Sequence, residues 1–279
     1  MNPETAGAPQ WHELKSADGA KARICGHGAH LCSWAPARGG ERLYLSGRAA
    51  FGPGAAIRGG VPVIFPQFAG EGPLPKHGFA RTAEWSLESA QEGEARFRLS
   101  DTAATRALWP HPFEAELSAA LDGQSLRVGL AVENRGGEPF SFTAALHTYL
   151  RVDDIAQVEL IGLHGLRYHD SANGGREMQE KSERLRIEGE VDRIYLDAPP
   201  SLELRDAGRR LRLQSQGFAD AVVWNPGAIK GAALADLDPD GYRRFVCIEA
   251  ATVGRPLRLA PGQRWTGMQT LVADDETNA

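Results

Sequence analysis

Residues 113–132 read FEAELSAALDGQSLRVGLAV, and this stretch decides the fold class. Apolar and polar side chains alternate on both sides of Asp122-Gly123. A period of two predicts a strand with one buried face, and an Asp-Gly pair supplies the positive φ angles of a tight turn. The stretch therefore predicts an antiparallel β-hairpin.

The period of two recurs along most of the chain, whereas a helical period is confined to residues 102–108, just before two prolines. A second hairpin is predicted over residues 202–213, with its turn near Asp206-Ala207-Gly208. Further strands are expected at residues 22–24, 43–45, 95–100, 141–152, 158–163, 221–224, 244–251 and 265–272. We therefore expect an all-β fold, one antiparallel β-sandwich domain over residues 1–279 with loose tails at about 1–10 and 274–279.

The composition excludes several classes of protein. The 279 residues carry 31 Lys+Arg against 36 Asp+Glu, a net charge of −5, and a nucleic-acid binder needs a basic surface, so we expect no nucleic-acid partner. No apolar run approaches the ~18 residues that cross a bilayer and no signal peptide is visible, so we expect no membrane association and a cytoplasmic protein. Three cysteines cannot pair completely, which fits a reducing compartment.

A loop rich in glycine and proline follows at residues 57–81, IRGGVPVIFPQFAGEGPLPKHGFAR. It should be ordered around a short apolar strand at residues 61–65, and functional sites concentrate on such loops. Residues 38–81 hold six Lys or Arg against two Glu, which indicates a small anionic ligand. Basic side chains on a solvated loop remain the alternative.

Two titratable residues lie inside predicted strands. Alternation places His147 on one strand face with Tyr149, and a structural histidine is one reading of it. Glu249 shares a face with Phe245 and Cys247, an apolar setting that raises the pKa of a carboxyl or demands a partner. A buried ion pair and a catalytic base are both open for Glu249.

Eight motifs resemble, in order, those of the hexose-6-phosphate mutarotases, the glucose-6-phosphate 1-epimerase branch of the aldose 1-epimerase superfamily. The resemblance covers residues 31–271, nearly the whole chain. The motifs are Arg58-Gly59-Gly60-x-Pro62, Phe65-Pro66-x-Phe68, His77-Gly78-Phe79-Ala80-Arg81, Trp109-Pro110-His111-Pro112-Phe113, Leu146-His147-Thr148-Tyr149, Asp192-Arg193-Ile194-Tyr195, Val223-Trp224-Asn225-Pro226 and Cys247-Ile248-Glu249.

This resemblance implies a galactose-mutarotase-like β-supersandwich whose site is an open cleft on the larger sheet. It also implies a role for each matching residue. The expected general acid is His147 and the expected general base Glu249; Arg58 and Arg81 are expected to bind substrate, His77 to contact the sugar and Asp192 to hold its hydroxyls.

The chain departs from the family pattern at two positions. Lys76 stands where a glutamine that binds sugar hydroxyls is often found, and Gln67 stands where an aromatic residue is often found. Lys76 could add a cation to a phosphate site. The departures leave the acid and base unchanged but bear on the choice of substrate.

Exchange of the anomers of an aldose needs only an acid and a base. The base takes the C1 hydroxyl proton while the acid protonates the ring oxygen, so no metal or other cofactor is expected. We expect His147 and Glu249 to lie on opposite sides of C1, with the pKa of His147 not depressed. The resemblance implies glucose 6-phosphate as the substrate, and the planar guanidinium group of arginine suits its 6-phosphate. The protein is separately expected to act as a monomer.

Two other functions stay open, an epimerase for unphosphorylated aldoses and a non-catalytic protein that binds sugar phosphates. Cys25-x-His27-x-x-His30-x-Cys32 resembles a set of zinc ligands, but its spacing is unfamiliar and the glycines inside it favour a turn between strands. We expect no metal there. Lys230 and Asp236 could lie at the cleft edge or cap turns.

Overall fold

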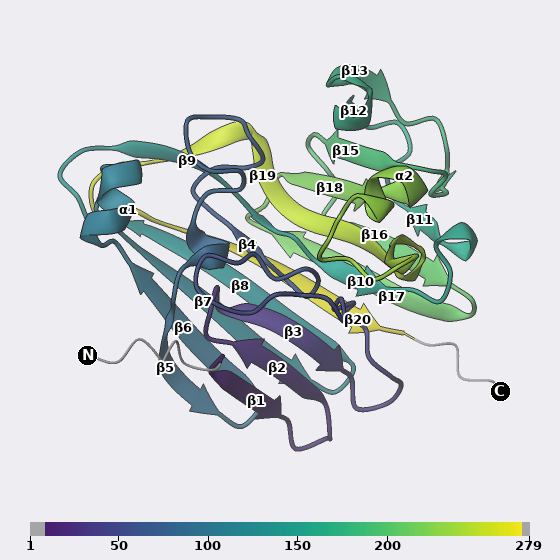
Figure 1. Cartoon of the computed structure of the whole chain (residues 1–279), viewed down its shortest axis with the longest axis horizontal. Helices are drawn as coiled ribbons and strands as arrows, with labels where there is room; N and C mark the ends of the chain where they lie inside the picture. Colours follow the sequence, from purple (N-terminus) through teal and green to yellow (C-terminus); the bar gives the residue numbers. More distant parts are fainter. Residues whose placement is uncertain (1–8, 275–279) are drawn as a thin grey trace.

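The computed structural model describes residues 9–274, which form three antiparallel sheets with few helices (Figure 1). The predicted all-β fold is confirmed. The small sheet has the order β1 (Trp11–Lys15), β2 (Lys21–Cys25) and β3 (His30–Ala35). Within the described part of the chain, no helix is long and apolar enough to cross a bilayer.

The two large sheets are built from strands that are distant in sequence. The eight-stranded sheet has the order β13 (Arg176–Gln179), β12 (Arg167–Asp170), β15 (Val191–Tyr195), β18 (Asp220–Asn225), β19 (Phe245–Leu259), β9 (Phe140–Leu146) and β4 (Val63–Ile64), and β10 (Tyr149–Arg151) also pairs with β19. The nine-stranded sheet has the order β14 (Arg184–Leu185), β11 (Glu159–Ile161), β16 (Ser201–Asp206), β17 (Arg209–Gln216), β20 (Arg264–Ala273), β8 (Ser125–Asn134), β7 (Phe113–Asp122), β6 (Glu94–Ser100) and β5 (Ser86–Gln91).

Short helices connect these strands. They are α1 (Ala103–Leu108), α2 (Gly227–Ala232) and the 3₁₀ turns η1 (Ala80–Thr82), η2 (Ile155–Gln157), η3 (Ser171–Asn173) and η4 (Gly241–Arg244). Thr102 caps α1 by accepting a hydrogen bond from the backbone N–H of Thr105. The predicted helical turn at residues 102–108 is therefore confirmed.

Both predicted hairpins are present, and their turns differ. In β7–β8, Asp122 still pairs with Ser125, so the loop is Gly123-Gln124 and Gly123 alone has a positive φ, 55°. In β16–β17, Ala207 and Gly208 both have positive φ, 46° and 84°, the pattern of a type I′ turn. The predicted turn at Asp122-Gly123 is confirmed, but Asp122 remains in the strand and only Gly123 adopts the left-handed conformation.

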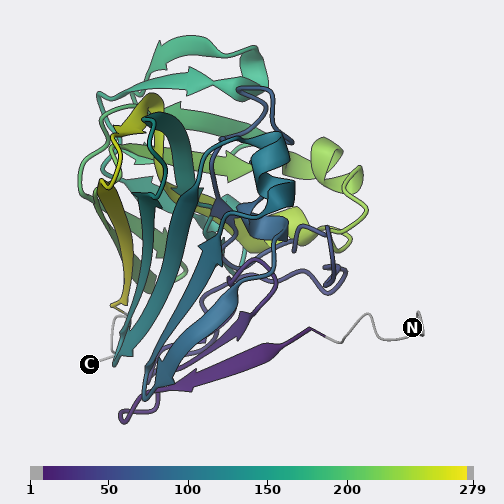
Figure 2. The same cartoon turned by 90° about the vertical axis from the view of Figure 1, so that its left-hand side faces the viewer.

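The main core lies between the two large sheets. Alternate side chains point inward from both, such as Leu117 and Leu130 from the nine-stranded sheet and Leu146 and Ile248 from the eight-stranded sheet. The small sheet packs beside β5 and β6 (Figures 1 and 2), where the ring of His12 meets the ring of Phe97 at 5.2 Å. The outer face of the eight-stranded sheet carries separate apolar clusters, so it too is covered.

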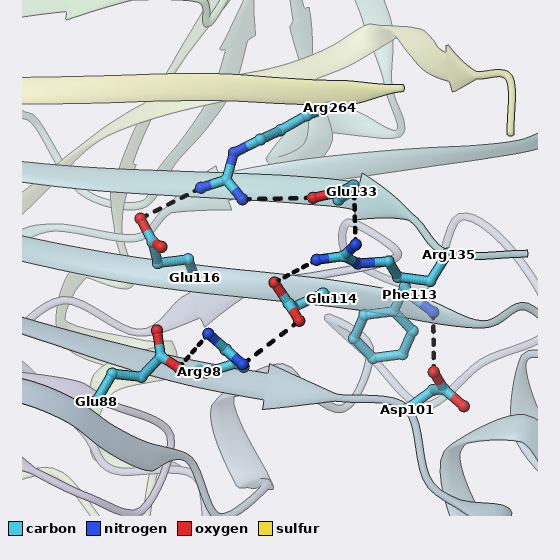
Figure 3. Close-up of polar contacts among 9 residues, drawn as sticks. All are labelled: Glu88, Arg98, Asp101, Phe113, Glu114, Glu116, Glu133, Arg135 and Arg264. Carbon is cyan, nitrogen blue, oxygen red and sulfur yellow. Dashed lines mark hydrogen bonds and ion pairs between the residues drawn. The ribbon is translucent and has the colours of Figure 1, made fainter. Parts of the chain in front are cut away.

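The outer face of the nine-stranded sheet carries a ladder of alternating charges (Figure 3). Arg135 pairs with Glu114 and Glu133 at 3.0 Å each, and Arg264 pairs with Glu116 at 3.2 Å and with Glu133 at 3.7 Å. The ladder runs through Glu88, Arg98, Glu114, Arg135, Glu133, Arg264 and Glu116. Polar outward residues on these strands therefore satisfy one another across the sheet.

Three predicted features differ in the structure. The strand at residues 141–152 is divided into β9 and β10 by His147 and Thr148, and the strand at 61–65 shrinks to β4. Residues 43–45 form only isolated bridges. Of the predicted tails, Gln10 accepts a hydrogen bond from Gly26 and Asp274 donates one to Arg210, whereas residues 1–8 and 275–279 lie outside the described residues.

Candidate active site

A cavity of about 530 Å³ lies on the outer face of the eight-stranded sheet, and not on the larger, nine-stranded sheet that the family resemblance implied. Strands β10, β15, β18 and β19 provide its floor together with His147, which lies between β9 and β10. The segments before and after β4 and the region of α2 provide its walls. All seven residues that the sequence singles out line it: Arg58, Lys76, His77, Arg81, His147, Asp192 and Glu249. Residues up to about 190 positions apart in the chain therefore meet in one hollow.

The floor owes its arrangement to strand register. β10 pairs with β19 at Tyr149 and Cys247, and β9 continues along β19 in the same register, so His147 lies directly opposite Glu249. Nε2 of His147 is 3.3 Å from Oε1 of Glu249. On the far side of Glu249, Val222 of β18 continues the same row.

The strand is interrupted where it carries the histidine. The N–H of His147 donates to the carbonyl of Pro62 at 3.0 Å, and the N–H of Thr148 turns back to Leu146 at 2.9 Å. The His147 ring stacks on Tyr149, with centroids 5.0 Å apart and an interplanar angle of 13°. The two rings share the face that alternation predicts.

Burial dominates the electrostatics of the acid–base pair. His147 is 8% exposed and Glu249 is 2% exposed. Burial, together with His77 and the nearby Arg81, lowers the pKa of His147 well below its ordinary value. Burial and the negative charge of Asp192 raise the pKa of Glu249 well above its ordinary value.

These directions correct one expectation, because the pKa of His147 is depressed in the free site. Burial disfavours the charged form of each group, so it favours the form of the pair in which the Glu249 carboxyl carries the proton and the His147 imidazole is neutral. Nδ1 of His147 and Oε2 of Glu249 have no hydrogen-bond partner among residues 9–274. Both atoms are also almost inaccessible to solvent.

A second expectation is corrected by geometry. His147 and Glu249 were expected on opposite sides of one carbon, but they touch side by side on a single sheet face. The two oxygens bonded to an anomeric carbon are also adjacent. A neighbouring acid and base could therefore reach both oxygens from the same side of a sugar.

Two arginines stand over the pair, and they differ in how many donors they have left. The Arg58 guanidinium donates to Asp236 through Nε at 3.2 Å and approaches the same oxygen through Nη2 at 3.1 Å, while Nη1 donates to Tyr149 at 2.9 Å. Arg81 donates from Nη2 to the carbonyl of Lys76 at 2.9 Å, and its buried Nε has no partner in the described chain. Burial lowers the pKa of Arg81. Arg81 is therefore the freer of the two toward an anion.

His77 presents a neutral imidazole to the cavity. Its backbone has a φ of 69°, and its Nδ1 accepts the N–H of Ala69 at 3.2 Å, which leaves the proton on Nε2. Burial and the charge of Arg81 lower the pKa of His77 to about 3. The ring lies 5.7 Å from the His147 ring, centroid to centroid, and can donate a hydrogen bond there.

Gln67, one of the two departures, organises the loop that carries Lys76 and His77. Its buried amide donates to the carbonyls of Ala69 and Leu74 at 3.2 and 3.1 Å and accepts the N–H of Leu74 at 3.0 Å. A side chain inside the loop thus replaces contacts that the backbone cannot make with itself.

Asp192 of β15 marks the other end of the cavity. Burial raises its pKa, while the charges of Lys230 and Lys76 act in the opposite direction. Of the residues left open by the sequence, Lys230 lines the cavity and pairs with Glu190 at 2.7 Å, and Asp236 holds Arg58.

The sequence assigned no site role to two aromatic residues of the floor, Tyr149 and Trp224, and core packing is the default reading of a tryptophan such as Trp224. Trp224 pairs in register with Cys247 on one side and with Asp192 on the other, in the row next to His147 and Glu249. Alternation from Glu249 through Cys247 could have indicated the row, but only the strand order shows which strand lies beside it.

The cysteine and histidine cluster of the N-terminal turn serves the arginines instead. Nε2 of His27 donates to the carbonyl of Ala55 and Nε2 of His30 to that of Gly59, both at 2.7 Å, on either side of Arg58 in sequence. Nδ1 of His27 lies 2.7 Å from Glu84. Within residues 9–274, no group of three or more potential metal ligands is found.

Comparison with known proteins gives a consistent family. The family model described as aldose 1-epimerase matches residues 10–271. A protein of Cenchrus ciliaris named "Putative glucose-6-phosphate 1-epimerase" is 35% identical over 274 residues, covering 93% of this chain and 83% of that protein. A protein of Escherichia coli K12 with the same name is 38% identical over 239 residues, covering 83% of this chain and 79% of that protein.

A solved structure agrees over nearly the whole chain. The crystal structure of "a putative mutarotase" from Salmonella typhimurium superposes with a TM-score of 0.88 at 31% identity, covering 95% of this chain and 90% of that one. The mutarotase-like fold therefore covers nearly the whole chain, including both large sheets.

Proposed function

The chain belongs to the aldose 1-epimerase family, and we propose that it interconverts the α and β anomers of a hexose 6-phosphate, with glucose 6-phosphate as the first substrate. The relatives carry the name of that activity. The observation that carries the proposal is the distance of 3.3 Å between Nε2 of His147 and Oε1 of Glu249 on the floor of the cavity. Arg58, Lys76 and Arg81 form a cationic wall beside them.

The chemistry follows from one acid and one base. Glu249, as carboxylate, takes the proton of the C1 hydroxyl while His147, as imidazolium, gives a proton to the ring oxygen. The bond from C1 to the ring oxygen breaks and C1 becomes an aldehyde. After rotation about the C1–C2 bond the former ring oxygen attacks the other face, His147 recovers its proton and Glu249 returns its own.

A phosphorylated substrate would also help to set the protonation state. Arg81 and Arg58 are among the charges that disfavour the imidazolium form of His147. A phosphate dianion bound to these guanidinium groups offsets their positive charge, so the imidazolium becomes easier to form. Substrate binding would thereby move the shared proton from Glu249 to His147, as the first step requires.

The remaining polar residues fit the sugar. We propose that Arg81 binds the phosphate first, since it has free donors, with Lys76 and Arg58 as further cations. His77 would donate from Nε2 to a sugar oxygen. Asp192 would accept from hydroxyls far from C1, and Trp224 offers a ring face for the sugar.

One observation favours a second candidate, an epimerase for unphosphorylated aldoses. Arg58 already spends three of its nitrogens on Asp236 and Tyr149. If Arg81 is likewise structural, the cavity has no strong anion site.

Exchange NMR between the anomers tests the proposal. The rate of anomer exchange is measured with [1-¹³C]glucose 6-phosphate and with [1-¹³C]glucose, each against a blank without enzyme. Faster exchange of the phosphate ester supports the proposal, and equal acceleration of both sugars indicates an enzyme for unphosphorylated aldoses. Binding without acceleration would indicate the non-catalytic protein that binds sugar phosphates.

Two variants test the assigned roles. His147→Ala and Glu249→Gln should each lose most of the acceleration, because a general acid or base contributes about 10²–10⁴-fold. Near-normal exchange by either folded variant would refute the assignment.

We further propose a monomeric protein of one domain in the cytoplasm. Light scattering would test whether the protein has the 30.1 kDa mass of a monomer. Fractionation of cells would test whether it lies in the cytoplasm.

A further inference from the structure

A polar side chain lies in the apolar interior, directly beneath the acid–base pair. Gln269 of β20 is 2% exposed and points into the space between the two large sheets. The next inward residue on that strand, Leu271, belongs to the main core and is 1% exposed. An amide at such a position is costly unless it is hydrogen-bonded.

Gln269 spans the sandwich to reach the opposite sheet. The hydroxyl of Thr148 donates to Oε1 of Gln269 at 2.5 Å, and Nε2 of Gln269 donates to the carbonyl of Ile248 at 3.1 Å. The orientation of the amide is fixed, because a backbone carbonyl only accepts. The N–H of Ile248 donates to the carbonyl of Thr148 at 3.1 Å and joins the two strands at the same point.

The two partners of Gln269 are the immediate neighbours of the acid and the base. Thr148 follows His147, and Ile248 precedes Glu249. Successive residues of a strand point to opposite faces. The side chains of His147 and Glu249 therefore face the cavity, while the side chains of Thr148 and Ile248 face the core, where the Thr148 hydroxyl meets Gln269.

The contact also lies where regular pairing fails. β9 ends at Leu146 and β10 begins at Tyr149, so no assigned strand spans His147 and Thr148. The N–H groups of these two residues bond to Pro62 and Leu146 instead of β19. The segment keeps one hydrogen bond to β19, from the N–H of Ile248 to the carbonyl of Thr148. A second tether helps such a segment to hold a side chain to a fraction of an ångström.

We propose that Gln269 is a positioning residue that keeps His147 and Glu249 in register for proton transfer, acting through Thr148 and the backbone of Ile248. This inference rests on the proposed epimerase function. It assigns the buried amide a part in the rate of reaction and none in substrate binding, since Gln269 does not line the active-site cavity.

The test compares kcat and KM for glucose 6-phosphate in matched variants. Gln269→Leu and Thr148→Val each remove one side of the contact at nearly constant volume, and both should lower kcat by about 10–100-fold with KM within about twofold, because small misplacements of catalytic groups are costly. Thr148→Ser keeps the hydroxyl and should rescue kcat. The double variant should be no worse than the poorer single variant, because both remove the same contact.

Leu271→Val is the control for stability alone. It disturbs the same strand and the same core without touching Thr148 or Ile248, so it should lower Tm and leave kcat intact. A folded Gln269→Leu protein with wild-type kcat would overturn the proposal, as would an equal loss of kcat in Leu271→Val.

A second readout separates this inference from the proposed function. The ring ¹⁵N resonances of His147, assigned with His147→Ala, should shift in Gln269→Leu and stay in place in Leu271→Val. If the wild-type protein does not accelerate anomer exchange, the epimerase proposal fails. Independently, unchanged His147 resonances in Gln269→Leu would overturn the positioning proposal.

Discussion

Glu249 illustrates how a single residue can oppose stability where it serves chemistry. Its carboxyl is almost fully buried and touches one histidine, while its second oxygen has no partner among residues 9–274. Ionising a carboxyl in such a place costs free energy, which is why its pKa is raised. A site that must pass protons retains this cost.

The first prediction concerns the pH dependence of that cost. The folded-state pKa of Glu249 lies above the ordinary value of 4.5, so the folded protein binds more protons than the unfolded chain between these two pKa values. Stability is therefore lost as the pH rises above about 4.5 toward the folded pKa. Glu249→Gln removes this loss and should make the protein more stable than wild type at pH 8, while abolishing the acceleration of anomer exchange.

Denaturant unfolding of wild type and Glu249→Gln between pH 4 and pH 8 measures the effect. The gap should close toward pH 4, where the wild-type carboxyl is neutral in both states. The lowered pKa of His147 removes stability only as the pH falls below about 6.5, so above that pH the comparison reports on Glu249. A gap independent of pH would argue against a raised pKa for Glu249.

The second prediction concerns Arg81. Its buried Nε has no partner among the described residues, so a bound phosphate would satisfy an existing deficit. Arg81→Ala should lower kcat/KM for glucose 6-phosphate by roughly 10–100-fold, the value of a charge-assisted hydrogen bond of about 1.5–3 kcal/mol. Activity on free glucose should change little.

Arg38→Ala is the matched control, because Arg38 is exposed and lies outside the cavity. It should leave both activities unchanged. Equal losses on the two sugars in Arg81→Ala would mean that Arg81 supports the fold of its loop and does not bind phosphate.

At the level of elements, the turn between β2 and β3 positions both arginine loops. His27 and His30 hold the backbone on either side of Arg58, and Gly28 donates its N–H to the carbonyl of Ala83 at 2.7 Å, near Arg81. A Cβ atom on Gly28 would lie 2.6 Å from the carbonyl oxygen of Arg81. The motif that resembles a zinc site thus holds the backbone of the two segments that carry Arg58 and Arg81.

The third prediction tests the hydrogen bond between His30 and Gly59. His30 is fully buried and donates to Gly59, the residue after Arg58. His30→Leu should destabilise the protein by about 1–3 kcal/mol, the cost of a buried acceptor left without its donor. It should also raise KM for glucose 6-phosphate several-fold, because the backbone next to Arg58 loses its anchor.

His30→Gln keeps a donor at the position of Nε2 and should recover most of the loss. Thermal unfolding and steady-state kinetics on the same preparations separate the two effects. A drop in Tm with unchanged KM would show that His30 fills the core without positioning Arg58.

For the whole molecule, the two faces of the nine-stranded sheet have different roles: the inner face is apolar and the outer face is charged. Its inner face supplies the apolar core on which the floor of the cavity rests. Its outer face neutralises itself through the ladder of Figure 3, with alternating Glu and Arg side chains. Each charged side chain of the ladder has a partner of the opposite sign.

The fourth prediction concerns the ladder. Arg264 bridges Glu116 and Glu133, and Arg264→Gln should cost about 0.5–1 kcal/mol at low salt, since exposed pairs contribute little individually. The difference from wild type should shrink in 1 M NaCl, where the screening length is about 3 Å. Arg127→Gln, on the same sheet face but outside the ladder, should show no such salt dependence.

Local pattern sufficed for the strands whose two faces meet different surroundings. Strand β7 alternates between buried and more exposed residues over its full length. The sequence of β8 alternates large apolar residues with small or polar ones, so both strands show the period. The strand β13 is exposed at every residue, and β12 and β15 are short, so no comparable alternation reveals them. Helical and strand periods are properties of neighbours in the chain, which is why this part could be predicted.

The sequence by itself determined the all-β class, both hairpins, the family and the candidate residues, because these depend on local spacing and ordered motifs. Only the tertiary structure decided that His147 stands opposite Glu249, that burial depresses the pKa of one and raises that of the other, and that Gln269 ties their strands from below. Register, burial and contact across a sandwich join residues about a hundred positions apart. Their energies depend on the packed surroundings of each group, which no local stretch of chain contains.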